Sequence, residues 1–161
     1  MLIKGEIKME YVSNIRKKVG NDAIFLPAVG CGIIQNKKIL LQKRADNKKW
    51  GIHGGYMNLG ENFIETLERE TKEELNVKPI NPRFVNIYSG EDMHYIYPNN
   101  DEVYAILVLY LVEEFEGELK PNCKELIELK WFDIEELPEN INECDVKIIN
   151  DVISLYKKHN N

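Results

Sequence analysis

The stretch Gly55-Tyr-Met-Asn-Leu-Gly-Glu-Asn-Phe-Ile-Glu-Thr-Leu-Glu-Arg-Glu-Thr-Lys-Glu-Glu-Leu-Asn-Val77 places six glutamates in one loop and one helix. Asn62, followed three residues later by Glu65, is the pattern of a capping box, which predicts that a helix begins at Phe63. Asn76 is expected to end this helix. The rest of the chain can be interpreted outward from this loop and helix.

The predicted helix combines an apolar stripe with an acidic flank. The stripe recurs at helical spacing, is expected to face a core, and consists of Ile64, Leu67, Thr71 and Leu75. Beside it lie Glu70, Glu73 and Glu74. Each pair of like charges at these spacings costs roughly 0.2–0.5 kcal/mol unless something neutralises it. Such oxygen donors suit a hard divalent cation such as Mg²⁺, which also bridges to substrate phosphates.

Arg69 is the cation nearest to this acidic flank. Glu65, one helical turn before it, and Glu61, in the preceding loop, are both candidates to pair with its guanidinium group. An ion pair with either would tie the loop or the first turn of the helix to the acidic flank.

The spacing of these residues resembles the Nudix box, the signature of hydrolases that cleave a nucleoside diphosphate linked to another group. The charged positions shared with this signature, at set offsets from Gly55, are Glu61, Arg69, Glu70, Glu73 and Glu74. Because so many positions are fixed at once, the pattern is far more specific than a lone glycine-rich loop. The alternative is an ordinary solvated acidic helix, which is common in acidic proteins. The complete set of charged positions favours the Nudix interpretation.

Three positions depart from the family pattern. Thr71 stands where an aliphatic residue is usual, but it keeps a methyl group for the core. Asn76 replaces the usual Gly, and Asn is the residue besides Gly that most readily adopts the left-handed conformation of a helix C-cap. Upstream, His53 replaces a Pro found in many relatives, which bears on the rigidity of the loop.

The resemblance implies an α/β Nudix fold, with a mixed β-sheet sandwiched between helices, and a metal-dependent reaction. Glu70 and Glu74 would hold Mg²⁺ or Mn²⁺, the carbonyl of Gly54 would complete the ligand shell, and Glu73 would support metal or water. Arg69 would orient Glu70 and tie back to Glu61, a structural role. Water would attack a phosphorus of the diphosphate bridge, and a carboxylate would take its proton.

In some relatives a glutamate from a later region completes the metal shell or acts as base. Glu125, which precedes the Trp131-Phe132 pair, is the candidate for that role in this chain. The catalytic candidates are therefore Glu73, Glu70, Arg69 and Glu125.

The candidates for substrate binding lie around the glycine pair. Two consecutive glycines let the backbone approach a metal-bound diphosphate, which makes Gly55 and its neighbour His53 candidates. Arg44 ends a predicted strand near this loop, and its planar fork matches phosphate oxygens, although a plain surface charge is the alternative. Tyr95 lies in a predicted hairpin or flap, Ser89 to Glu102, and either stacks a base or covers a sheet edge.

Strands and helices are expected to alternate along one domain. An amphipathic helix, residues 10–19, belongs to an N-terminal extension, residues 1–22, and docks on the domain or on a second subunit in a homodimer. The Nudix domain is expected to span residues 23–161. Its expected strands are 23–26, 29–34, 38–44, 79–88, 103–112 and 124–131. Residues 134–137 are expected to form one helical turn, and residues 145–159 a closing helix.

The composition limits the classes of function. A chain of 161 residues suits one domain, and a net charge of −6 argues against binding nucleic acid or acidic membranes. A phosphorylated small molecule of nucleotide type remains compatible, because a bound cation reverses the local charge. The three cysteines, Cys31, Cys123 and Cys144, show neither a disulfide framework nor zinc-ligand spacing.

The sequence also predicts a location and leaves two rival functions open. No signal peptide or membrane-spanning run is apparent, so a cytoplasmic protein is expected. One rival is a Nudix-fold module that senses a nucleotide without cleaving it, although the complete set of glutamates argues against it. The other is a structural interaction domain that uses the N-terminal helix.

Overall fold

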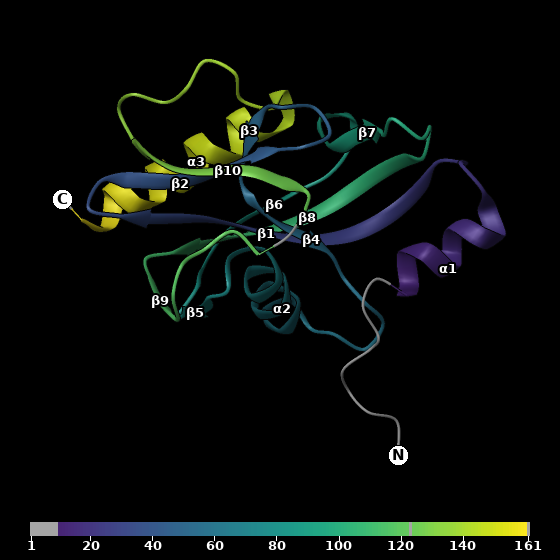
Figure 1. The fold of residues 1–161 in the computed structure, drawn as a ribbon, viewed down its shortest axis with the longest axis horizontal. Coiled ribbons are helices and arrows are strands. Elements are labelled where there is room, and N and C mark those ends of the chain that lie inside the picture. Colours follow the sequence, from purple (N-terminus) through teal and green to yellow (C-terminus); the bar gives the residue numbers. More distant parts are fainter. Residues whose placement is uncertain (1–9, 123, 161) are drawn as a thin grey trace.

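The protein is described by a computed structural model that covers residues 10–122 and 124–160, so residues 1–9 of the predicted extension and Cys123 lie outside the described residues. A curled mixed sheet lies between helix α2 (Phe63–Leu75) on one face and helix α3 (Glu143–His159) on the other (Figure 1). Helix α1 (Glu10–Val19) lies beyond one end of the sheet. The predicted fold, a mixed sheet sandwiched between helices, is confirmed.

The main sheet has the strand order β10-β2-β1-β8-β6, with β3 added to β2, β4 to β1 and β7 to β8. Strands β1 and β8 run parallel, and the other pairs run antiparallel. The strands are β1 (Ile24–Gln35), β2 (Lys38–Arg44), β3 (Trp50–Gly51), β4 (His53–Tyr56), β6 (Arg83–Tyr88), β7 (His94–Ile96), β8 (Glu102–Val112) and β10 (Leu126–Asp133). A separate small sheet pairs β5 (Lys78–Ile80) with β9 (Glu114–Glu116).

Strand β1 is continuous, so the prediction of two short strands separated at Pro27 is wrong. Proline removes only one N–H from the ladder, and the carbonyl oxygen of Pro27 still accepts a hydrogen bond of 3.0 Å from the N–H of Met57. Ten residues of β1, Ile24 to Ile33, pair with β8. This pairing outweighs the local break that the sequence indicates.

The sheet separates two apolar clusters, one under each covering helix. Strand β1 contributes to both: Leu26 belongs to the cluster under α3, and Val29 and Ile33 belong to the cluster under α2. A strand that is covered on both faces is expected to be apolar on both. The same alternation sends neighbouring residues of β4 towards opposite layers, which matters for the site.

Helix α2 begins and ends where the sequence predicts. The Asn62 side chain accepts from the Glu65 N–H and the Glu65 side chain accepts from the Asn62 N–H, each at 2.9 Å. Asn76 adopts the left-handed conformation, with φ 61° and ψ 27°. The prediction that Ile64 faces the core is wrong, because its side chain is exposed. Thr66 is buried instead, and its hydroxyl donates a hydrogen bond to the Glu61 carboxylate. Relative to the prediction, the buried stripe of α2 is therefore rotated towards the side that carries the glutamates.

Three smaller expectations have mixed outcomes. The predicted strand over residues 79–88 is divided, because Asn81 takes a left-handed conformation (φ 47°) between β5 and β6. Residues 134–137 form a turn, closed by a bond from the Glu136 N–H to the Asp133 carbonyl, instead of a helical turn. The predicted flap is a hairpin, in which β7 follows a short 3₁₀ helix (Glu91–Met93) and pairs with β8.

Helix α1 docks on the domain. Tyr11 and Val12 pack against the cluster under α3. Arg16 is turned inwards, and its guanidinium group donates to the carbonyl oxygens of Asp22 and Glu102, each at 2.7 Å. A second subunit at this helix stays a prediction, as does the domain boundary at residue 22. No helix among the described residues is long and apolar enough to cross a membrane.

Candidate active site

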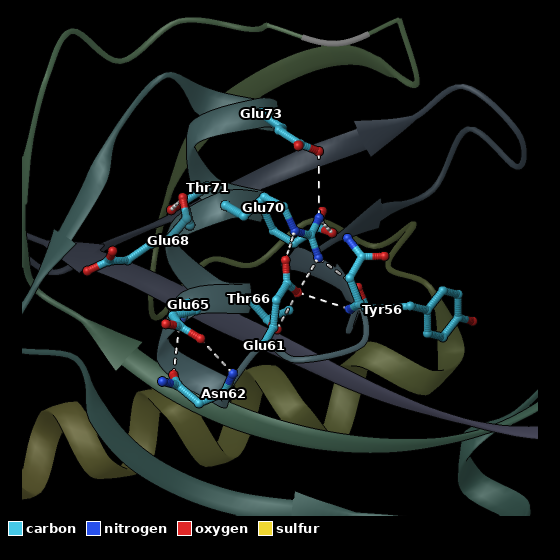
Figure 2. A network of polar contacts seen from close by, with 11 residues as sticks. Tyr56, Glu61, Asn62, Glu65, Thr66, Glu68, Glu70, Thr71 and Glu73 are labelled. Atoms are coloured by element: carbon cyan, nitrogen blue, oxygen red, sulfur yellow. Dashed lines mark hydrogen bonds and ion pairs between the residues drawn. The ribbon is translucent and has the colours of Figure 1, made fainter. Parts of the chain in front are cut away.

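Arg69 is the centre of the polar network on α2, and Figure 2 labels its partners Glu61, Glu70 and Glu73. Its guanidinium group donates to both carboxylate oxygens of Glu61, at 2.6 and 2.9 Å, and to Glu70 Oε1 at 2.5 Å. It also donates to the backbone carbonyl of Tyr56 at 2.9 Å, and Glu73 Oε2 lies 3.7 Å away. One side chain therefore joins the loop, strand β4 and the acidic flank, and fixes their relative positions.

Glu61 anchors the loop that precedes the helix. Besides Arg69, its carboxylate accepts bonds from the Asn58 N–H at 3.0 Å and from the Thr66 hydroxyl at 2.8 Å. Burial acts to raise the pKa of the Glu61 carboxyl, but these hydrogen bonds outweigh burial and lower the pKa to about 2. Glu61 is therefore a stably ionised partner of Arg69. Glu65, the other candidate partner, caps the helix instead.

Glu70 is held in a tighter and less polar position. Its side chain is buried, and a Cβ atom added at Gly55 would lie 2.5 Å from its carboxylate, so any larger residue there would displace the carboxylate. Burial raises the pKa of Glu70 to about 7; the charge of Arg69 opposes this shift, and the charges of Glu74 and Glu73 add to it. A cation bound beside Glu70 would favour its ionised form.

Glu74 lies near a residue that the family pattern does not contain. Its Oε2 is 3.5 Å from Nδ1 of His53, which is fully buried in β4. Within residues 10–122 and 124–160, Glu74 Oε2 and both ring nitrogens of His53 have no hydrogen-bond partner. His53 was predicted to bind substrate, but its burial means that it can act on a substrate only through its neighbours.

The donors on α2 suit a hard divalent cation in their chemistry. Glu70, Glu73 and Glu74 offer carboxylate oxygens, the ligands that Mg²⁺ and Mn²⁺ prefer. The buried and unpartnered Oε2 of Glu74 is the kind of atom that a cation would satisfy. In the part of the chain that the structure describes, no three acidic, histidine or cysteine side chains already converge on one point. The carboxylate oxygens that a cation would need are therefore present on α2, and Arg69 holds one of these carboxylates, that of Glu70.

A second polar group, separate from the Arg69 network, contains Arg44 and Tyr95. Arg44 donates two hydrogen bonds to Asp46, at 3.0 and 2.7 Å, and its charge also interacts with Tyr97 and Asp145. Tyr95 stacks on Tyr97 with ring centroids 6.3 Å apart. The pairing with Asp46 uses Nε and Nη2 of the Arg44 guanidinium group. Substrate binding by Arg44 and by Tyr95 stays a prediction.

Tyr56 links the two polar groups. Its carbonyl oxygen accepts from Arg69, and its hydroxyl lies 2.6 Å from the hydroxyl of Tyr97. The ring points away from the glutamates (Figure 2). Tyr56 was not among the predicted site residues. Its position directly after the glycine pair was a usable signal, because its backbone and its side chain contact different polar groups.

Asp145 is another buried acid that the sequence analysis did not identify. It lies in the first turn of α3, and its Oδ2 accepts from the Ile52 N–H at 3.3 Å. Burial raises the pKa of Asp145 to about 6, against the lowering effects of that N–H, of Arg44 and of His53. Nothing in the sequence distinguished it from a surface acid at a helix start, because its burial depends on packing against Gly51, where an added Cβ would lie 2.3 Å from Oδ2.

Replacing Asp145 with Asn is expected to flatten the pH dependence of the unfolding free energy in EDTA. The folded-state pKa of about 6 exceeds the ordinary 3.8. Between these values the folded protein holds a proton that the unfolded chain has lost. Stability therefore falls as pH rises through this window. Asn stays neutral, so the variant is expected to lose about 1–3 kcal/mol of this dependence.

Urea unfolding of both proteins in EDTA, at pH steps from about 4 to 7, measures the effect. Glu70 contributes a slope of the same sign in both proteins, so the difference between them belongs to Asp145. Two parallel curves would show that Asp145 has an ordinary folded-state pKa.

The two remaining candidates lie on backbone elements around the network. Gly54 pairs with Gly30 across β4 and β1, and an added Cβ would lie 2.2 Å from the Val29 carbonyl oxygen. Glu125 is exposed in the turn before β10, and its own carbonyl oxygen accepts a bond of 2.8 Å from the Ala45 N–H. The roles of the Gly54 carbonyl and of the Glu125 side chain as metal ligand or base stay predictions.

Comparison with known proteins gives the same assignment as the motif. Over 118 residues the chain is 32% identical to an ADP-ribose pyrophosphatase of Methanocaldococcus jannaschii; the match covers 70% of this chain and 66% of that protein. It is 25% identical to the NAD-capped RNA hydrolase NudC of Vibrio atlanticus, covering 70% of this chain and 39% of that one. The chain thus matches less than two thirds of the length of either relative.

Among solved structures, the chain resembles a MutT NUDIX hydrolase from Burkholderia pseudomallei, with a TM-score of 0.69 and 22% identity; the match covers 80% of this chain and 98% of that one. This likeness supports the fold. A family model for the NUDIX domain matches residues 25–152, which include the sheet, the Arg69 network and most of α3. The chain belongs to the NUDIX domain family.

Proposed function

We propose that this protein is a metal-dependent pyrophosphohydrolase that cleaves the diphosphate bridge of a nucleoside diphosphate linked to another group. The observation that carries the proposal is the Arg69 network, which holds Glu61 and Glu70 while a buried oxygen of Glu74 has no hydrogen-bond partner among the described residues. A helix that served only as a solvated face would not bury Glu70 or order Arg69 between two glutamates.

Each residue of the network has a distinct part in the proposed reaction. Glu70 and Glu74 hold Mg²⁺ or Mn²⁺, with the Gly54 carbonyl, and Arg69 keeps Glu70 in place. When bound, the cation polarises phosphoryl oxygens and lowers the pKa of a bound water. Glu73 supports metal or water, and either Glu73 or Glu125 takes the proton of the attacking water. Gly55 leaves room for the Glu70 carboxylate close to the backbone.

The substrate is expected to be a small molecule of nucleotide type. The similarity to an ADP-ribose pyrophosphatase makes ADP-ribose the first compound to test. Tyr95 and Arg44 are the candidates to contact the far end of the substrate, because they lie in the second polar group. The net charge of −6 disfavours long nucleic acids, although the similarity to an NAD-capped RNA hydrolase makes a capped RNA worth including.

The second candidate function is a Nudix-fold module that senses a nucleotide without cleaving it. The Arg44–Asp46 pair would be present in either case, so it does not distinguish sensing from cleavage. The ordered glutamate network favours catalysis, since a sensor has no need to hold ionised glutamates around an arginine. Both functions require a nucleotide site, so turnover has to separate them.

A hydrolysis panel tests the proposal. It contains ADP-ribose, nucleotide sugars, dinucleoside polyphosphates, CDP-alcohols, oxidised deoxynucleoside triphosphates and an NAD-capped RNA, each with Mg²⁺, with Mn²⁺ and with EDTA. We expect metal-dependent release of a nucleoside monophosphate from at least one compound, and none in EDTA. Thermal stabilisation by a compound that is not hydrolysed under any condition would support the sensing module instead.

A homodimer and a cytoplasmic location also stay predictions. Light scattering on the full chain gives the mass in solution, and a variant with Tyr11 and Val12 changed to Ser tests whether α1 is involved. Because both side chains pack on the apolar cluster under α3 in the same chain, the change is expected to lower stability, and conversion of a dimer to a monomer would place α1 at the interface.

A further inference from the structure

We infer that His53 is a positioning residue for Glu74, whose carboxylate oxygen Oε2 accepts a hydrogen bond from the ring N–H at Nδ1. The bond would hold the carboxylate in one orientation, ready for a divalent cation. This inference rests on the proposed function, because it assigns Glu74 to the metal site. It adds a residue that the Nudix pattern does not include.

Two buried polar atoms, one on β4 and one on α2, face each other. His53 Nδ1 and Glu74 Oε2 are 3.5 Å apart, and neither has a hydrogen-bond partner among the described residues. The histidine side chain is fully buried, and the glutamate side chain is 15% exposed. Leaving a buried polar atom without a partner costs about 1–3 kcal/mol, and more for a charged group. The separation exceeds the usual N–H···O distance of about 2.7–3.2 Å by only a few tenths of an ångström.

The backbone of His53 is held in place by close strand pairing. His53 begins β4 and pairs with Cys31 of β1, next to the Gly54–Gly30 pair. An added Cβ at Gly54 would strike the backbone of Val29 and Gly30, so these two strands are as close as glycine permits. Glu74 comes from the last turn of α2, on the other side of the contact. The donor is therefore on the fixed sheet and the acceptor on the helix it orients.

Acidic groups from two helices interact with the His53 ring. Glu74 approaches from α2, and Asp145 of α3 is close enough for the charge of His53 to lower its pKa, against the raising effect of burial. The other neighbour is the thiol of Cys31, whose pKa is raised by burial and by the charge of Glu74. No lysine or arginine among the described residues forms an ion pair with Glu74. The imidazole is thus the donor available to this carboxylate.

A residue that orients a metal ligand contributes to affinity without touching the metal. Removing such a partner typically weakens metal binding or activity by about 10–100-fold. The effect is expected to depend on the N–H alone, so another donor at the same place should preserve it. This property separates a positioning role from a purely space-filling one.

The experiment compares His53→Asn with His53→Leu by calorimetric titration of the metal-free protein with Mn²⁺. The Asn amide places an N–H close to the position of Nδ1, whereas Leu fills similar space without a donor. We expect Asn to bind Mn²⁺ within about threefold of the original protein and Leu to bind about 10–100-fold more weakly. Equal binding by the Leu variant and the original protein would overturn the inference.

Two controls keep folding separate from metal binding. Val152→Ala, a truncation of a fully buried residue of the other helix, α3, should lower stability and leave Mn²⁺ affinity unchanged. Urea unfolding in EDTA measures stability for every variant. If the Leu variant does not fold, the tautomer of His53 in the metal-free original protein decides, through long-range ¹⁵N–¹H couplings. A proton on Nδ1 supports the inference, and a ring protonated only at Nε2 contradicts it.

The inference and the proposed function fail in different ways. A protein that binds Mn²⁺ with the expected Asn and Leu pattern but hydrolyses no compound would retain the positioning role and lose the enzyme. A protein that hydrolyses a substrate while the Leu variant binds Mn²⁺ normally would retain the enzyme and lose the positioning role. Absence of Mn²⁺ binding by the original protein would overturn both.

Discussion

Replacing Glu74 with Gln is expected to lower kcat at least about 100-fold on whichever substrate the panel identifies. Gln keeps the size of the side chain and removes the charge that would hold the cation. A 100-fold loss corresponds to about 2.7 kcal/mol of barrier, within the several kcal/mol that a bound cation supplies. Steady-state rates at saturating Mg²⁺ and Mn²⁺ measure the loss.

The fold of the Glu74→Gln variant is expected to remain intact in EDTA, with a thermal midpoint equal to or above the original. The substitution removes a partly buried carboxylate charge, whose buried oxygen Oε2 has no hydrogen-bond partner among the described residues. Glu68→Gln is the matched control, because Glu68 lies on the same helix and, among the residues that the structure describes, its carboxylate pairs only with the exposed Lys78. Its rate should stay within about twofold of the original, since surface pairs contribute little. Normal turnover by a folded Glu74 variant would remove Glu74 from the metal site.

Replacing Arg69 with Ala is expected to cost about 3–5 kcal/mol of unfolding free energy. The Arg69 side chain is 17% exposed and donates to Glu61 and Glu70, whose side chains are 19% and 12% exposed. The variant leaves two partly buried carboxylates and the Tyr56 carbonyl without their donor. Urea unfolding at constant metal concentration measures the loss.

Two further variants make the Arg69 result specific. Arg83→Ala removes an arginine whose ion pair with Glu113 is more exposed, and it should cost less than about 1 kcal/mol. Arg69→Lys keeps the charge but cannot bridge Glu61 and Glu70 with a planar fork, so an intermediate loss is expected. It also provides a measurement if the Ala variant does not fold. Equal losses for Arg69→Ala and Arg83→Ala would mean that the network contributes no more than a surface pair.

Local signals in the sequence predicted the elements that local interactions stabilise. The bounds of α2 follow from the Asn62 and Glu65 pair and from the left-handed Asn76, which need no distant partner. Strand β1 could not be predicted in the same way. Its local break at Pro27 is overridden by pairing with β8, a segment far along the chain.

The residues of the candidate site also divide into those placed by local spacing and those placed by distant packing. The contact between Arg69 and Glu61 was predictable, because the motif fixes their spacing. The roles of His53, Tyr56 and Asp145 were not, because each depends on which layer of the sheet the side chain enters and on what packs against it there. Ile64 was misplaced for a related reason: the hydrogen bond between Thr66 and Glu61 lets a polar residue take the buried position.

The parallel pairing of β1 with β8 has a consequence for the order of folding. It joins Ile24 to Val103, roughly 80 residues apart along the chain, and such contacts slow folding because a long loop must close first. Strand β4 is positioned by β1, so the contact between His53 and Glu74 can form only after β1 is in place. A partly folded chain with α2 already formed would therefore carry the acidic flank without the strand that orients it, and cation binding would report on completion of the native sheet.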